Sequence, residues 1–106
     1  MEKFFGRITK IGEMRTGMGQ NGQWTIIDFT LTNFAVDGSA ESVNLVASGS
    51  FAQSINNLKD VLRHDETCYD GFFIAEYKPQ CRNFRGKDGN EYQITELKLN
   101  TMTRVF

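Results

Sequence analysis

The sequence predicts one all-β domain over residues 1–106, a five-stranded Greek-key barrel with a single α-helix between its third and fourth strands. Three observations lead to this prediction. Five segments alternate apolar and polar residues, which is the pattern of half-buried β-strands. One segment alone has the 3.6-residue period of an amphipathic helix. A chain of 106 residues has room for one hydrophobic core and not for two.

The first strand is expected in FFGRITKIGEM, where Phe4, Gly6 and Ile8 share one face until Gly12 interrupts the pattern. A glycine inside a strand often marks a bulge or a sharp bend, which suits a strand that curls around a barrel. Residues 16–23 follow, with three glycines and an Asn-Gly pair. Because these residues supply the positive φ angles of a mobile loop or hairpin, the segment is predicted to be a loop.

The second and third strands are expected in WTIIDFTLTN and SVNLVASG, each with one face toward the core. The residues predicted to face inward are Ile27, Phe29, Leu31, Val43, Leu45 and Ala47. The residues predicted to face outward are Trp24, Ile26, Asp28, Thr30 and Thr32 on the second strand and Asn44, Val46 and Ser48 on the third.

The period then changes to that of a helix in SFAQSINNLKDVLRH. Phe51, Ile55, Leu58 and Leu62 fall at i, i+4, i+7 and i+11, which places them on one stripe. The fourth strand is expected in DETCYDGFFIAEYKPQCR, with Tyr69, Phe73 and Ala75 on one face. Pro79 predicts a sheet edge or a bulge near the end of this strand, because proline cannot donate to the ladder. A hairpin in FRGKDGNE leads to the last strand, YQITELKLNTMT.

Three strands, a helix and two strands joined by a long hairpin form the arrangement of the oligonucleotide/oligosaccharide-binding (OB) fold. In that fold the face of strands 2 and 3 and the loops between strands 1 and 2 and between strands 4 and 5 bind ligand.

The sequence resembles the bacterial single-stranded-DNA-binding protein family and its small relatives. The similar segments are FFGRITKIGEMR, NGQWTIIDFTLTN, VNLVASGSFAQSINNLK, YDGFFIAEYK and RNFRGKDGNEYQITEL. The resemblance implies that Phe84 takes the place of a stacking tryptophan and that Phe34 lies near another stacking position. At the positions of two further family aromatics the chain has Ser42 and Ser48, and TMTRVF does not resemble the acidic tail of the family.

Charge and composition indicate the cellular compartment and the class of ligand to expect. The net charge of −1 argues against a strongly basic nucleic-acid binder, yet Lys78, Arg82, Arg85 and Lys87 crowd into ten residues. The first residues lack a signal-peptide core and no apolar run is long enough to span a bilayer, so we expect a cytoplasmic protein with no membrane partner. Cys68 and Cys81 are interpreted as buried thiols in a reducing compartment.

Binding of single strands requires flat aromatic surfaces for bases and cations for phosphates. Trp24 is the first candidate, with barrel capping or a dimer interface as its alternative role. Phe84 is the second, with hairpin packing between subunits as its alternative. The candidate cations are Arg7, Arg15, Lys78, Arg82, Arg85 and Lys87, and Tyr77 and Tyr92 are either ligand contacts or packed cross-strand partners.

Two functions follow from these residues. The first is non-sequence-specific binding of single-stranded DNA, in replication, recombination or repair, with RNA as a ligand that the sequence does not distinguish. The alternative is a protein-interaction or assembly module on the same fold. Apolar outer-face residues, namely Ile26, Val46, Phe72 and Ile74, predict a homo-oligomer, either a dimer or a tetramer. The lone His64 is interpreted as structural, and no enzymatic activity, metal site or cofactor is expected.

Overall fold

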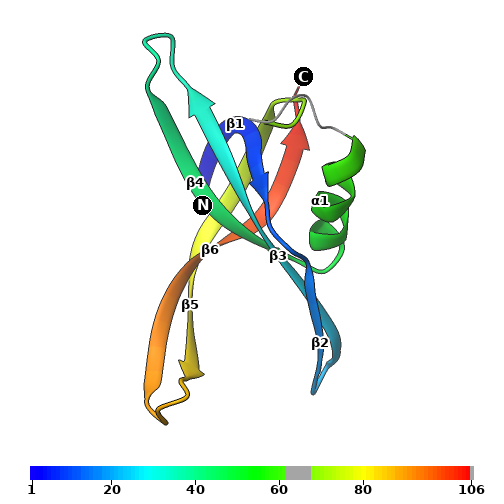
Figure 1. Cartoon of the computed structure of the whole chain (residues 1–106), viewed down its shortest axis with the longest axis vertical. Helices are drawn as coiled ribbons and strands as arrows, with labels where there is room; N and C mark the ends of the chain where they lie inside the picture. The colour runs from blue at the N-terminus through cyan, green and yellow to red at the C-terminus, as the bar shows by residue number, and fades with distance from the viewer. Residues whose placement is uncertain (62–67, 106) are drawn as a thin grey trace.

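The structure, a computed structural model, describes residues 1–61 and 68–105 and, within them, the side chains of all residues except 61, 82 and 84. Over this part the chain forms six strands and one helix (Figure 1). They are β1 (Glu2–Ile11), β2 (Arg15–Gly19), β3 (Gly22–Phe34), β4 (Ala40–Ser48), α1 (Ser50–Val61), β5 (Phe73–Arg85) and β6 (Glu91–Arg104).

Five of the strands close into the predicted OB barrel, with α1 between the third and fourth of them. The sheet runs in the order β1-β5-β6-β4-β3-β2, and a further pairing of β1 with β3 closes it. β1 changes partner at Gly6, the last residue paired with β5, and from Arg7 onward it pairs with β3. A Cβ at Gly6 would lie 2.6 Å from the carbonyl oxygen of Thr32, so a glycine is needed where β1 crosses to β3.

The core lies inside this barrel, on the face that the alternation of apolar residues predicted. Ile27, Phe29 and Leu31 of β3 are buried there against Val43, Leu45 and Ala47 of β4. Each large side chain so buried contributes about 1.5–3 kcal/mol to folding. One outer-face residue departs from the prediction: Thr32 is buried, and its hydroxyl hydrogen-bonds with those of Thr9 and Ser42.

α1 packs against the barrel with a face close to the predicted stripe, but the buried face is shifted so that Ala52, and not Phe51, meets the core. Ala52 and Ile55 are buried and Leu58 packs on the core, whereas Phe51 remains 37% exposed. Leu62 lies outside the described residues. Among the described residues no helix combines the length and the apolar character needed to cross a membrane.

The prediction of a loop at residues 16–23 is wrong, because most of this segment is strand. β2 pairs with β3 from Arg15 opposite Ile26 to Gly19 opposite Gly22, and only residues 20–21 form the turn. The glycines therefore serve an extended hairpin, here called the β2–β3 arm (residues 15–26).

A second hairpin, the β5–β6 arm (residues 80–96), projects from the same end of the barrel (Figure 1). Pairing of β5 with β1 ends at Tyr77 opposite Glu2, so beyond this point β5 has β6 as its described neighbour on one side only. Pro79 lies in this edge segment, where proline is tolerated because one side of the strand carries no described ladder. The edge prediction for Pro79 is confirmed, although β5 continues past it to Arg85 and the irregularity in register lies between Glu76 and Tyr77.

Candidate functional site

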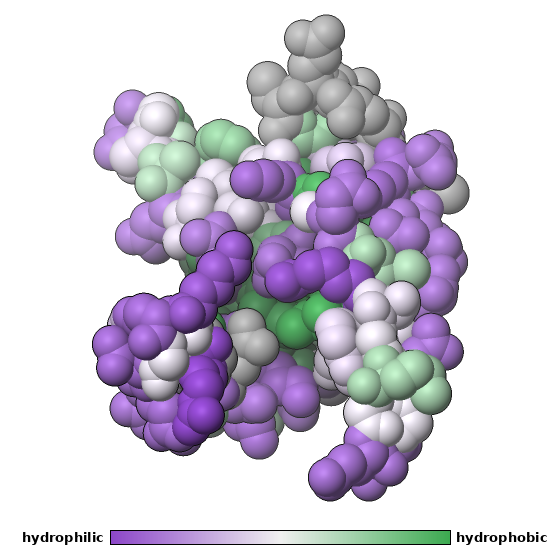
Figure 2. All heavy atoms as spheres, turned by 60° about the horizontal axis from the view of Figure 1, so that its bottom comes forward, coloured by the Kyte–Doolittle hydropathy of each residue, from purple (hydrophilic) through white to green (hydrophobic). Residues whose placement is uncertain are grey.

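A groove lies between the two arms on the outer face of β3 and β4. It consists of two adjoining hollows, of about 500 Å³ and about 310 Å³, which share Val46 and Glu96. Thr30, Asn44 and Val46 form its floor, and Trp24 and Gln80 belong to its opposite walls. Figure 2, which brings the arm end forward, shows apolar surface in the hollow between two projections, one mostly polar and the other of mixed polarity. The outer face of these two strands is where OB folds bind oligonucleotides.

Trp24 forms the aromatic wall of the groove and is 48% exposed. It is paired with Gly17 of β2, and its indole ring lies across the backbone of that strand. A Cβ at Gly17 would collide with the six-membered ring of Trp24, whereas at Gly19 it would meet Cδ1 at an ordinary 3.6 Å. Gly17 therefore makes room for the ring, a role that the sequence analysis missed when it assigned these glycines to a loop.

The charges of the groove are mixed. Lys10, Arg15 and Lys98 line it together with the carboxylates of Asp28 and Glu96. Arg15 Nη2 donates to Asp28 Oδ2 at 3.1 Å, from β2 to β3, and both side chains are more than half exposed.

Lys78 lies next to the groove wall that contains Gln80 and Lys98. It is exposed and directly opposite Lys98 in the β5–β6 ladder. Residues directly opposite in a ladder share one face of the sheet, so the two ammonium groups extend the cationic side of the groove.

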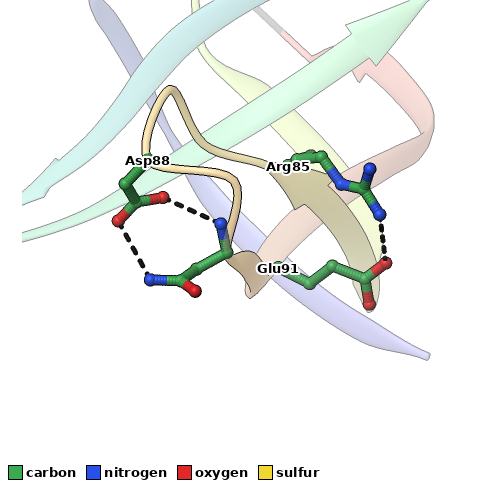
Figure 3. Close-up of polar contacts among 4 residues, drawn as sticks. Arg85, Asp88 and Glu91 are labelled. Atoms are coloured by element: carbon green, nitrogen blue, oxygen red, sulfur yellow. Dashed lines mark hydrogen bonds and ion pairs between the residues drawn. The ribbon is translucent and has the colours of Figure 1, made fainter.

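The tip of the β5–β6 arm is organised by its own polar contacts (Figure 3). Asp88 accepts hydrogen bonds from the backbone N–H of Asn90 at 3.0 Å, from its side-chain amide at 3.2 Å and from the hydroxyl of Tyr92. The Tyr92 hydroxyl, followed by the Asn90 N–H, holds the pKa of Asp88 below its ordinary value. Arg85 Nη2 lies 3.5 Å from Glu91 Oε1, so a carboxylate accompanies this cation.

Two more of the predicted nucleic-acid contacts, Lys87 and Tyr92, lie at this tip. Lys87 is exposed, and the ring of Tyr92, which is 43% exposed, covers Gly86. The side chains of Arg82 and Phe84 lie outside the described part of the structure.

Phe34 and Arg7 lie apart from the groove, around a notch of about 200 Å³. Phe34 ends β3 near the turn to β4, at the opposite end of the molecule from the arms (Figure 1). It lies ten positions along β3 from Trp24, a span of roughly 33 Å. The guanidinium of Arg7 stands 5.3 Å from the centre of the Phe72 ring, which stacks on Phe5.

Arg7 is already engaged by the protein. One of its terminal nitrogens donates to the carbonyl oxygen of Tyr69 at 3.4 Å and lies 4.0 Å from Asp70. The structure therefore places the described predicted contacts at several separate sites. Trp24, Arg15 and Lys78 lie at the groove, Arg85, Lys87 and Tyr92 at the tip of the β5–β6 arm, and Phe34 and Arg7 at the notch.

Tyr77 is a core residue, which answers the choice between ligand contact and packing. It is 7% exposed and belongs to the buried cluster, and burial raises the pKa of its hydroxyl. Its position two residues beyond Ala75, on the inward face of β5, was the signal for this role. Cys68 is buried as predicted, but Cys81 is exposed, with its Sγ 3.4 Å from the Thr95 hydroxyl, so the prediction of two buried thiols is wrong for Cys81.

Within the described part of the chain, no group of three or more His, Cys, Asp or Glu side chains is placed so that it could hold a metal ion. His64 lies outside this part.

The comparisons with known proteins concern the fold. No family model matches the sequence, and no curated protein matches it. Two crystal structures of Rim1, a mitochondrial single-stranded DNA binding protein from S. cerevisiae, are similar over 98% of this chain and 92% of theirs, with a TM-score of 0.55. They are 15% and 16% identical to it, the second being selenomethionine-labelled. This likeness supports the OB fold, and it does not single out the bacterial family that the sequence resembles.

Proposed function

We propose that this protein binds single-stranded DNA without sequence preference in the groove between the arms. The observation that carries the proposal is the half-exposed Trp24, which lies over glycines of β2 at the rim of a groove also lined by Ile26 and Val46. The groove lies on the ligand-binding face of the OB fold, and the structures similar in fold include a single-stranded DNA binding protein of yeast mitochondria.

In this proposal Trp24 contacts the bases, and the lysines of the groove contact the phosphates. A base laid on the open side of Trp24 would also meet Ile26 and Val46, and each stacked base contributes about 1–3 kcal/mol. Lys98 and Lys78 lie on one wall for the phosphates, and Lys10 lies farther along the groove. Phe84 and Arg82, at the positions implied by the family resemblance, would extend the path along the β5–β6 arm.

The test is binding of fluorescently labelled oligo(dT), measured by anisotropy at low and moderate salt. We expect saturable binding that weakens as salt rises, because neutralised phosphates release counterions. Unlabelled oligo(dT) of the same length should compete, and duplex DNA should compete poorly because its bases are not free to stack. Oligo(U) distinguishes RNA from DNA as the ligand. No binding to oligo(dT) at low salt would contradict the proposal.

An assembly role has its own supporting observation, an apolar patch on the outer face of β1 and β5. Phe5, Phe72 and Ile74 are 38%, 36% and 39% exposed, and Phe5 lies directly opposite Ile74. The Lys3–Glu76 ion pair, at 3.5 Å, borders the patch. Because this patch is separate from the groove, it supports the proposal that two or more copies associate here while the groove stays free for DNA.

Association through this patch is tested by light scattering during gel filtration. Ile74→Ser should lower the mass of an oligomer to that of a monomer, whereas Ile26→Ser, in the groove, should leave the mass unchanged. A parent protein that is monomeric at all concentrations would contradict the assembly proposal and leave the DNA-binding proposal standing.

A further inference from the structure

The Arg15–Asp28 ion pair occupies the groove where a bound strand would run. Asp28 lines one of the two hollows and Arg15 the other, so their 3.1 Å contact spans the junction between them. Both side chains are more than half exposed, at 53% for Arg15 and 61% for Asp28. Exposed pairs of this kind add little to folding stability, so the fold itself does not require a carboxylate at this position.

Asp28 has two effects on a polyanion that enters the groove. It satisfies donors of Arg15, the residue type best suited to bind a phosphate through parallel N–H groups. It also adds a negative charge to a groove that already carries Glu96. Both effects oppose the binding of phosphates, and neither opposes the stacking of a base.

We propose that Asp28 is a built-in competitor of phosphate for Arg15 and thereby sets the selectivity of the groove. This inference rests on the proposed function. On binding, Arg15 exchanges the Asp28 carboxylate for a phosphate of the strand. A polyanion without free bases gains that exchange and contacts with the groove lysines, whereas a single strand also gains stacking on Trp24. Asp28 therefore selects unpaired nucleic acid over other polyanions.

The experiment compares Asp28→Asn with the parent for binding of labelled oligo(dT) and labelled inorganic polyphosphate. Asparagine keeps the shape and removes the charge. We expect affinity for oligo(dT) at low salt to rise about threefold to tenfold, with a larger gain for polyphosphate. The slope of log K against log salt should steepen by up to about 0.7 for oligo(dT), the value for one phosphate contact on a single strand. The reason is that in the parent the Asp28 carboxylate regains a counterion when Arg15 leaves it for a phosphate, and this uptake offsets the counterion that the phosphate releases.

Two controls separate the pair from a general charge effect. Asp60→Asn, on the exposed side of α1, changes net charge by the same amount without touching the groove and should leave both ligands unaffected. Arg15→Gln should have a small effect in the parent and should abolish most of the gain when added to Asp28→Asn. If circular dichroism shows that Asp28→Asn is unfolded, Asp28→Ser provides a second neutral variant.

The outcomes distinguish the two proposals. A parent that binds oligo(dT), with neutral variants at Asp28 no better than Asp60→Asn, would overturn the competitor role of Asp28 and leave the function intact. A gain that survives Arg15→Gln would overturn the exchange of partners. Absence of oligo(dT) binding by the parent and by every variant would overturn the proposed function and this inference with it.

Discussion

The two arms share a design and differ in what they leave accessible. In each, an aromatic ring lies over a glycine on the other side of the hairpin, Trp24 over Gly17 and Tyr92 over Gly86. Each arm also carries an arginine paired with a carboxylate of the neighbouring strand, Arg15 with Asp28 at 3.1 Å and Arg85 with Glu91 at 3.5 Å, although Asp28 lies on β3 just beyond the β2–β3 arm.

The difference lies in where the ring and the ion pair are directed. Trp24 and both members of its neighbouring ion pair line the groove. The Tyr92 hydroxyl instead bonds Asp88 and so helps to hold the turn at the tip. The same arrangement thus forms a wall of the groove in one arm and holds a turn in the other.

The largest effect that sharpens this comparison is expected from Trp24→Ala. Loss of one stacked base should weaken oligo(dT) binding by roughly tenfold to a hundredfold, the equivalent of about 1–3 kcal/mol. The measurement is anisotropy of a labelled oligonucleotide. Tyr92→Ala is the matched variant in the other arm, and an equal loss there would break the proposed division between the arms.

A smaller effect is expected from Gly17→Ala, which leaves Trp24 in the sequence and displaces its ring. The added Cβ would collide with the indole, so the ring must move off β2. We expect an altered tryptophan emission maximum and oligo(dT) binding about threefold to tenfold weaker, a fraction of one stacking contribution. Gly19→Ala, where the new Cβ makes an ordinary contact, is the control. Identical spectra for Gly17→Ala and the parent would contradict the placement of Trp24.

The smallest effect is expected from Tyr92→Phe and concerns pH. Removing the hydroxyl should move the pKa of Asp88 up toward its ordinary value of 3.8, because that hydrogen bond is the largest cause of its lowering. In the parent the folded pKa lies below the unfolded one. The carboxylate therefore stabilises the turn fully well above pH 3.8, and this contribution is lost as pH falls through the lowered value. A carboxyl NMR titration checks both points, and DNA binding at neutral pH should barely change.

The sequence predicted the barrel and much of its core because alternation on β3 and β4 decides which side chains are buried. The prediction was wrong where the same residue types are compatible with either of two local structures. The glycines of residues 16–23 suit a loop, and only the pairing of Gly17 with Trp24 shows why they serve an extended arm. In α1 the stripe through Phe51 was right in period, but Ala52 is the residue that fits against the barrel.

The candidate site was predictable in its residue types and less so in its grouping. Trp24 and Arg15 lie on one groove as expected for a binding face, whereas Phe34 lies at the far end of the same strand. The Arg15–Asp28 contact depends on the register of β2 against β3, which an expected loop does not have. Strand pairing brings together charged residues that are far apart in the sequence. The spacing of these residues along the sequence therefore does not predict their ion pairs.

The most direct test of the account is quenching of the single tryptophan as oligo(dT) is added at low and moderate salt. The account predicts saturable quenching that shifts to higher oligonucleotide concentration as salt rises, because the base stacks on Trp24 while phosphates meet the groove cations. Unchanged Trp24 emission at low salt, with binding demonstrated on the same sample by anisotropy, would place the strand elsewhere on the barrel and contradict the groove as the site.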